Sequence, residues 1–160
     1  VPGVLALSVV QQPGGGASYV SQGANEATQF SLASRYGNIG LLAHNYLAGN
    51  SFTSLAIGAR VHLIYKDGKT ETFIVQEVLR FRAMPPDTSP SAYRNLVTHQ
   101  TLSDRQLFNR VYTGQRHLTF QTCIAHAGDE NWGRLFVIAL PAAPGLADPP
   151  PLDQPVIVSQ

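Results

Sequence analysis

Residues 117–124 read HLTFQTCI, and residues 133–140 read GRLFVIAL. In the first stretch apolar and polar side chains alternate, which is typical of a β-strand with one buried face. The second stretch is apolar on both faces after Arg134, as in a fully buried strand. Cys123 alternates with the polar residues of the first stretch, so we expect it on the more exposed face, at the end of its strand. Arg134 is expected to begin the second strand, after a polar loop over residues 125–133.

Working outward, short apolar runs separated by turn signals recur along the chain, and helical periodicity is scarce. Residues 4–10 are expected to form a strand, and residues 37–45 a loop that leads into a buried strand. Strands at residues 60–65 and 70–81 are expected to be joined at Asp67-Gly68, a good two-residue turn. The sequence therefore predicts an all-β fold.

One helix is predicted after Ser103. Ser103 and Gln106 form an S-x-x-Q capping box, and the apolar residues of 107–112 recur at helical spacing. Gly114 suits the position just beyond the end of a helix. We expect this helix to pack under a loop and not to carry chemistry.

The composition indicates a folded domain with a substantial core. The chain has 160 residues, of which 44% are hydrophobic and 13% are charged, and this argues against disorder. A net charge of +1 argues against a nucleic-acid partner. We expect one domain over residues 1–160, with a proline-rich extension at 141–160. No apolar run approaches the roughly 20 residues that a membrane-spanning helix needs.

The residues that could carry chemistry are few. Cys123 is the single cysteine, so it cannot form an internal disulfide. A reactive cysteine needs partial exposure and a positive group nearby, and Arg134 could supply that charge. His44 ends an apolar run, where a histidine by itself is usually a hydrogen-bonded structural residue. His126, three residues after the cysteine, is the rival candidate for the partner of the thiol.

Together these residues resemble the motifs of the sortase family. Residues 42–45 (LAHN) are similar to its histidine motif, and residues 119–123 (TFQTC) are similar to its TLxTC motif. Residues 133–139 (GRLFVIA) resemble the strand that an arginine opens in sortases. The sequence departs from the family pattern at Ala43, where glycine is common, and at Phe120, which replaces leucine.

The spacing between the motifs also matches the family. Phe52, Leu55 and Gly58 stand where sortases have similar residues, although Ala59 replaces a frequent aspartate. The resemblance spans residues 37–139.

The resemblance implies a closed sortase-type β-barrel with one or two short helices in the loops. It also implies a cysteine transpeptidase with His44, Cys123 and Arg134 as catalytic residues and Thr122 as a substrate-binding residue. Such an enzyme cleaves an LPxTG-like sorting signal through a thioacyl-enzyme and transfers it to an amine, of a cell-wall precursor or a pilin lysine. We expect neither a cofactor nor a metal, since no acidic cluster suggests calcium. The implied location is the extracellular face of the cell membrane, anchored by a segment outside this chain.

Two other classes of protein remain open. The first is a cysteine hydrolase of another fold that uses His126, because papain-like enzymes place the cysteine before the histidine. L,D-transpeptidases are a further enzyme class, but they need an SHGC-like segment that residues 121–123 do not supply. The second is a non-catalytic β-barrel binding module on the cell surface, in which Cys123 is inert.

Overall fold

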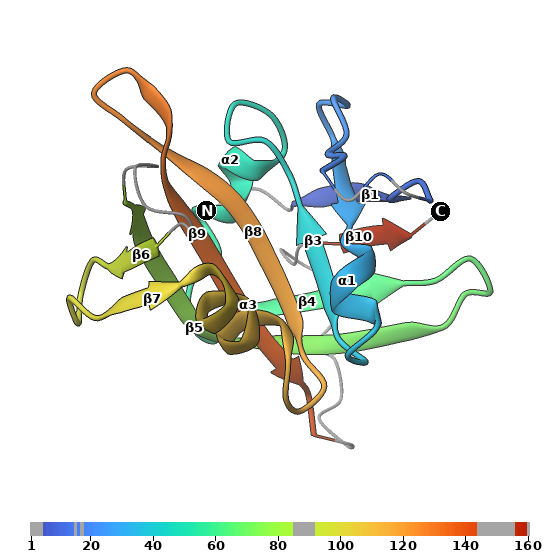
Figure 1. The fold of residues 1–160 in the computed structure, drawn as a ribbon. Coiled ribbons are helices and arrows are strands. Elements are labelled where there is room, and N and C mark those ends of the chain that lie inside the picture. Colours follow the sequence, from blue (N-terminus) through green and yellow to red (C-terminus); the bar gives the residue numbers. More distant parts are fainter. Residues whose placement is uncertain (1–4, 15, 17, 85–91, 144–155, 160) are drawn as a thin grey trace.

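The computed structural model describes residues 5–14, 16, 18–84, 92–143 and 156–159, and within them the chain is mainly β (Figure 1). The predicted all-β fold is therefore confirmed. The strands and helices of the described residues are β1 (Ala6–Gln11), β2 (Glu26–Gln29), α1 (Ser31–Ser34), β3 (Ile39–Leu42), α2 (Gly49–Phe52), β4 (Arg60–Ile64), β5 (Thr70–Ala83), β6 (Ala92–Asn95), β7 (Thr101–Ser103), α3 (Asp104–Tyr112), β8 (Leu118–His126), β9 (Asp129–Pro141) and β10 (Val156–Ser159).

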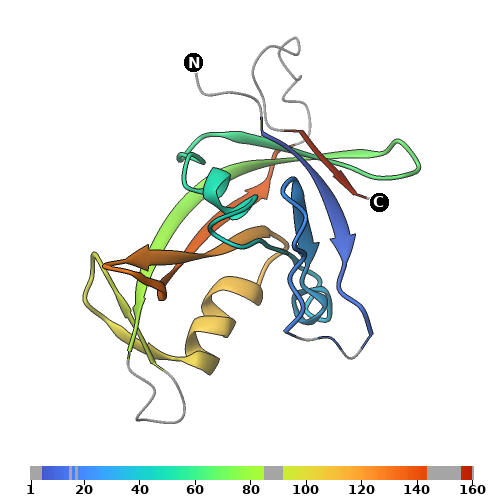
Figure 2. The ribbon, with the colours of Figure 1, turned by 90° about the horizontal axis from the view of Figure 1, so that it is seen from above.

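The strands form one sheet in the order β4-β10-β1-β2-β3-β8-β9-β5-β6-β7. Because β4 also pairs with β5, the ends of the series from β4 to β5 meet, and the strands surround a common core. Seen from above, they enclose a central region, and α3 lies outside it (Figure 2). A register shift between Val75 and Glu77 interrupts the pairing of β5 with β9. Such a bulge bends a strand, which lets β5 pair with β4 near its start and with β6 near its end.

Two apolar clusters lie on opposite faces of β8 and β9. The inner cluster fills the region between the strands and includes Leu41, Phe120 and Leu135. The outer cluster joins α3 to the sheet and includes Val111 and Phe136. Because side chains alternate along a strand, membership of a cluster shows which face a residue takes.

The predicted helix is confirmed as α3. The Ser103 side chain accepts a hydrogen bond from the Gln106 backbone, and the Gln106 side chain accepts one from the Ser103 backbone. Gly114, just beyond the helix, has a φ of 102°, which glycine adopts without strain. The described residues also contain α1 and α2, so they hold three helices instead of the expected one or two. Each of the added helices is a single turn without a side-chain cap, and therefore has little local signal.

The hairpin between β4 and β5 is confirmed, with a different turn. Gly68 has a φ of 81°, whereas Asp67 does not have a positive φ. The backbone N–H of Tyr65 donates a hydrogen bond to the carbonyl oxygen of Lys69. The loop between them therefore has three residues, 66–68, instead of two.

The prediction of a loop over residues 125–133 is wrong, because most of this segment belongs to β8 and β9. β8 continues to His126 and β9 begins at Asp129, so only Ala127 and Gly128 form the turn, both with positive φ. Cys123 and Arg134 therefore lie within their strands and not at the ends. The polar side chains of this segment hid the strands, because the ladder here extends past the core. Figure 1 shows the far end of the hairpin projecting beyond the neighbouring strands.

The C-terminal segment is only partly described. Residues 144–155, in the expected extension, lie outside the described residues. Val156–Ser159 form β10, which pairs in parallel with β1 on one side and β4 on the other. These four residues are thus part of the sheet instead of lying across its surface. None of the described helices has the length and apolar character needed to cross a membrane.

Gly49 in α2 packs so closely on the neighbouring chain that a larger residue does not fit. A Cβ atom there would lie 2.6 Å from the carbonyl oxygen of His44 and 2.7 Å from that of Ala43, and would also contact the Thr122 hydroxyl. This contact fixes α2 over β8 and fixes the segment that carries His44.

We expect Gly49→Ala to destabilise the protein by about 1–3 kcal/mol, because an added methyl group forces backbone to move. Urea denaturation measures this change. Gly14→Ala is the matched control, since a Cβ at Gly14 meets nothing within 4 Å. Equal stability of the two variants would contradict the close packing.

Candidate functional site

Cys123 and Arg134 are direct partners across two strands. β8 and β9 run antiparallel, and their register places Cys123 opposite Arg134. Residues that are opposite in such a pair have Cβ atoms about 4.5–5.5 Å apart. Their neighbours Thr122 and Leu135 are buried inward, so alternation puts the thiol and the guanidinium together on the outer face, where both are half-buried.

His44 lies two residues beyond the end of β3, the strand beside β8. β3 and β8 are parallel with Leu42 paired to Gln121, and the Ala43 N–H continues the ladder to the Gln121 carbonyl at 3.2 Å. Ala43 belongs to the inner cluster, so the next residue, His44, faces outward. Continuing this register by two residues from Leu42 brings His44 level with Cys123. Cys123 and Arg134 thus lie on adjacent strands, and His44 follows the end of β3 on the other side of β8 and faces the same way.

Asn131 connects the thiol and the guanidinium. The Cys123 Sγ donates a hydrogen bond to the Asn131 Oδ1 at 3.5 Å. The Arg134 Nη1 donates to the backbone oxygen of Asn131 at 3.1 Å and to that of Gly133 at 2.9 Å. Both bonds use Nη1, so among the described residues no hydrogen bond occupies Nη2 or Nε. Those nitrogens are available to a substrate oxygen.

The segment after β3 holds the imidazole from several sides. The ring of Tyr46 stacks on that of His44, with centroids 5.1 Å apart. The Gln22 side chain lies 3.0 Å from the His44 Nε2. The next residue, Asn45, donates a hydrogen bond of 3.0 Å to the carboxylate of Glu130. The histidine segment is therefore tied to the hairpin that carries Cys123 and Arg134.

An apolar cleft of about 140 Å³ begins at Arg134 and runs between α3 and the sheet. Its polar groups are Arg134, Gln121 and Asp104, and aromatic rings dominate the rest. The rings of Phe30 and Tyr112 meet edge to face at 5.1 Å, and other rings extend this packing. The remaining lining residues are Tyr93, Leu107, Phe108, Val111 and Phe136. A hollow of this size and lining suits an apolar side chain of a ligand.

Tyr93 is a site residue that the sequence did not reveal. It comes from β6, within a region where no motif was recognised. Burial raises the pKa of its hydroxyl, the charges of Asp104 and Cys123 add to this effect, and Arg134 opposes it. These couplings place the phenol near the thiol and the guanidinium. An isolated tyrosine in a short strand gives no signal that could have found it.

Thr122 and His126 lie apart from the three outward-facing candidates. Thr122 is 2% exposed on the inner face, and its Oγ1 has no hydrogen-bond partner among the described residues. His126 is exposed near the end of β8, and its ring packs against Trp132 with centroids 4.7 Å apart. The described structure thus brings together His44, Cys123 and Arg134, with Thr122 behind the thiol.

No family model and no curated protein matches this chain. Among solved structures it is similar to sortase C1 of Streptococcus agalactiae, with 16% identity and a TM-score of 0.44 over 78% of this chain and 57% of that chain. It is also similar to the Clostridium perfringens sortase D5 transpeptidase, with 13% identity and a TM-score of 0.44 over 84% and 70%. The SrtA sortase from Actinomyces oris is 15% identical, with a TM-score of 0.46 over 91% of this chain and 80% of that chain.

The chain therefore spans little more than half the length of the sortase C1 chain. The similar solved structures named here are all sortases.

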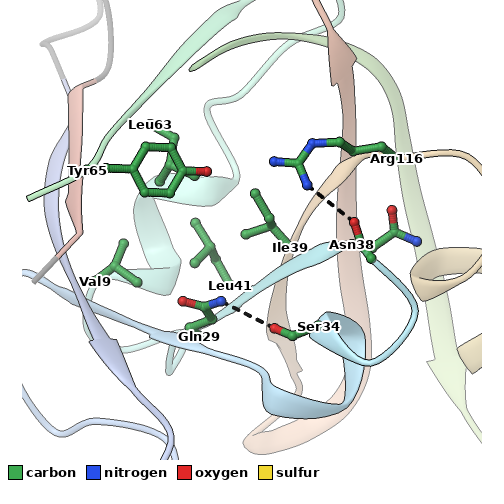
Figure 3. A pocket seen from close by; sticks show the side chains of 10 residues that line it. Val9, Gln29, Ser34, Asn38, Ile39, Leu41, Leu63, Tyr65 and Arg116 are labelled. Atoms are coloured by element: carbon green, nitrogen blue, oxygen red, sulfur yellow. Dashed lines mark hydrogen bonds between the residues drawn. The ribbon is translucent and has the colours of Figure 1, made fainter. Parts of the chain in front are cut away.

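A second hollow, of about 240 Å³, lies away from this site, beside the start of β3 (Figure 3). Its apolar lining comes from Val9, Ile39 and Leu63, and Arg116 and Tyr65 lie at its edge. The Arg116 side chain is already engaged, since it donates to the Gly37 carbonyl at 3.3 Å and to the Glu71 carboxylate at 2.7 Å. This arrangement suits a structural ion pair better than a reactive site.

Glu71 is the centre of that ion pair. Besides Arg116, the Tyr65 hydroxyl donates to its carboxylate at 3.0 Å, and Lys69 lies 3.7 Å away. Burial alone would raise the pKa of Glu71, but the hydrogen bonds from Arg116 and Tyr65 and the nearby positive charges outweigh burial and hold the pKa below its ordinary value.

Because the pKa of Glu71 is lower in the folded state, its ionised form stabilises the protein above the unfolded-state pKa of about 4.3. That stabilisation is lost as the pH falls through the folded-state value. We expect Glu71→Gln to lower the free energy of unfolding by an amount on the order of 1 kcal/mol near pH 6 and by less near pH 3. Denaturation at several pH values measures the difference.

Glu77→Gln serves as the control, because Glu77 pairs with Arg110 in a more exposed position. A stability difference between wild type and Glu71→Gln that stays constant from pH 6 to pH 3 would contradict the assigned role.

Proposed function

We propose that this chain is the catalytic domain of a sortase-type cysteine transpeptidase, with His44, Cys123 and Arg134 as its catalytic residues. The observation that supports this most directly is the outward-facing arrangement of these three residues, with His44 just after β3, Cys123 on β8 and Arg134 on β9. The arrangement combines a nucleophile, an acid–base group and a donor for a developing negative charge. An apolar cleft begins at Arg134.

The first half of the proposed reaction cleaves the sorting signal. The Cys123 thiol gives its proton to His44, and the thiolate attacks the carbonyl carbon of the threonine in an LPxTG-like segment. A carbon–sulfur bond forms and the peptide C–N bond breaks. His44 then passes the proton to the departing amine. The product is a thioacyl-enzyme and a released peptide with a new amino terminus.

The second half transfers the acyl group. The amine of the acceptor attacks the thioester carbon and gives a proton to His44, and the thiolate of Cys123 departs. In both halves the carbonyl oxygen gains negative charge, and Arg134 would donate hydrogen bonds to it. The Nη2 and Nε groups, which hold no hydrogen bond within the described structure, suit this role.

The aromatic cleft would bind the apolar residues of the sorting signal. The cleft reaches Arg134, which supports a substrate that runs along α3 and places the bond to be cleaved at Cys123. We also assign Thr122 to substrate binding, as the motif implies. Its hydroxyl is buried beneath Gly49 on the inner face, so its influence on the substrate would be indirect, through the position of the neighbouring Cys123.

The acceptor would be an amine of a peptidoglycan precursor or a pilin lysine. Such an enzyme would work on the extracellular face of a bacterial cell membrane, anchored by a segment outside this chain. No nucleic acid and no cofactor take part in the proposed reaction.

The alternatives make different predictions for the same residues. A hydrolase that uses His126 needs that ring free to move toward the thiol, whereas it packs on Trp132. A binding module leaves the thiol inert, whereas Cys123 is half-buried on the outer face beside a guanidinium. Both observations favour the transpeptidase.

The test is to mix the chain with an LPxTG peptide and to search for an acyl adduct at Cys123 by mass spectrometry. We expect the adduct in the wild type and its absence in Cys123→Ala. His44→Ala should slow acylation by about 10²–10⁴-fold, because it removes a placed acid–base group. His126→Ala is the matched control and should acylate at the wild-type rate.

No adduct in a folded wild type, tested with several sorting peptides, would reject the transpeptidase. A large loss in His126→Ala with none in His44→Ala would identify the hydrolase instead.

The role of Arg134 is tested separately by Arg134→Lys and Arg134→Ala. We expect both to lower kcat/KM by about 10²–10³-fold, because lysine keeps the charge but loses the planar set of donors. Steady-state transpeptidation kinetics measure the loss. Near-normal turnover by Arg134→Lys would show that charge alone suffices and that the assigned hydrogen-bonding role is wrong.

A further inference from the structure

Gln22 contacts His44 from a distant part of the sequence. Its side-chain nitrogen Nε2 lies 3.0 Å from the His44 Nε2, and its Oε1 accepts a hydrogen bond of 3.4 Å from the Tyr46 hydroxyl. Tyr46 in turn stacks on the His44 ring with an angle of 20° between the planes. The imidazole is thus held on one face by a phenol and at one nitrogen by an amide.

The backbone on both sides of Gln22 is fixed. The preceding residue, Ser21, is buried, and its N–H donates to the Thr28 hydroxyl at 2.8 Å. The Ser21 hydroxyl donates to the carboxylate of Glu26 and accepts from the Gly23 N–H at 3.1 Å. Gln22 itself is exposed, so its side chain is presented to His44 from a rigid support and contributes little to the core.

The chemistry of the two groups fixes where the proton lies. An amide nitrogen of glutamine only donates, so the ring nitrogen that faces it must accept. A neutral imidazole that accepts at Nε2 carries its proton at Nδ1, because the hydrogen bond at one nitrogen sets the tautomer.

We propose that Gln22 is a positioning residue that selects the Nδ1–H tautomer of His44. This proposal adds to the proposed function and rests on it only for its catalytic consequence. In this tautomer the Nδ1–H can only donate, so the proton that His44 takes from the thiol enters at Nε2. When His44 becomes doubly protonated, Nε2 turns into a donor, so the Gln22 amide must rotate to present its oxygen.

The test reads the tautomer directly from the ¹⁵N chemical shifts of the His44 ring, in the full chain without substrate and at a pH where the ring is neutral. His44→Ala assigns the signals. We expect a protonated Nδ1 and an unprotonated Nε2 in the wild type. Gln22→Glu offers only acceptors to the ring and should move the proton to Nε2. Gln22→Met keeps the side-chain length without the donor and should remove the preference for Nδ1.

Gln76→Met on β5 is the matched control, because Gln76 is also exposed and lies in another part of the fold. It should leave the His44 signals unchanged. A proton at Nε2 in the wild type, or an unchanged Nδ1–H form in Gln22→Met, would overturn the proposal.

This measurement needs no turnover, so its outcome tests the role of Gln22 separately from the transpeptidase assignment. An active enzyme whose His44 carries its proton at Nε2 would refute only the role of Gln22. An Nδ1–H tautomer in a chain that forms no adduct would refute only the function. In the active enzyme, Gln22→Met should lower kcat/KM by about tenfold or more through loss of ring orientation.

Discussion

The structure of the site depends on the backbone hydrogen bonds of β8, which pairs in parallel with β3 and antiparallel with β9. These ladders decide which side chains share a face and which lie at the same level. The thiol, the imidazole and the guanidinium are therefore aligned by main-chain register and not by contacts with one another. The side chains that do contact them, those of Asn131, Gln22 and Tyr46, adjust orientation within that frame.

The sequence was informative where the physical signal is local. The alternation in residues 117–124, the apolar run after Arg134 and the capping box at Ser103 each depend on neighbours within a few positions, and each predicted its element. Arg134 was a candidate for the positive group near the thiol, and the antiparallel pairing of β8 with β9 places the two residues opposite each other. The hairpin end was mistaken because Ala127 is not a usual turn residue, and polar side chains there resembled a loop.

The rest depends on contacts between distant segments, which no local pattern contains. The parallel register of β3 with β8, the cleft beneath α3 and the approach of Tyr93 to Arg134 all require the folded sheet. The contact of Gln22 with His44 is of the same kind, because it joins a loop to the end of a strand. The resemblance to sortases pointed to His44, whereas its own surroundings in the sequence did not.

The parallel pairing of β3 with β8 also determines when His44 and Cys123 come together during folding. Loop closure between distant segments costs entropy before contacts compensate for it, so chains rich in such pairings fold slowly. The segments around His44 and Cys123 meet only when that long-range ladder forms. During synthesis and folding the thiol is therefore an ordinary cysteine without its imidazole partner. Assembly of the sheet would therefore delay the proposed activity until the chain has reached its native topology.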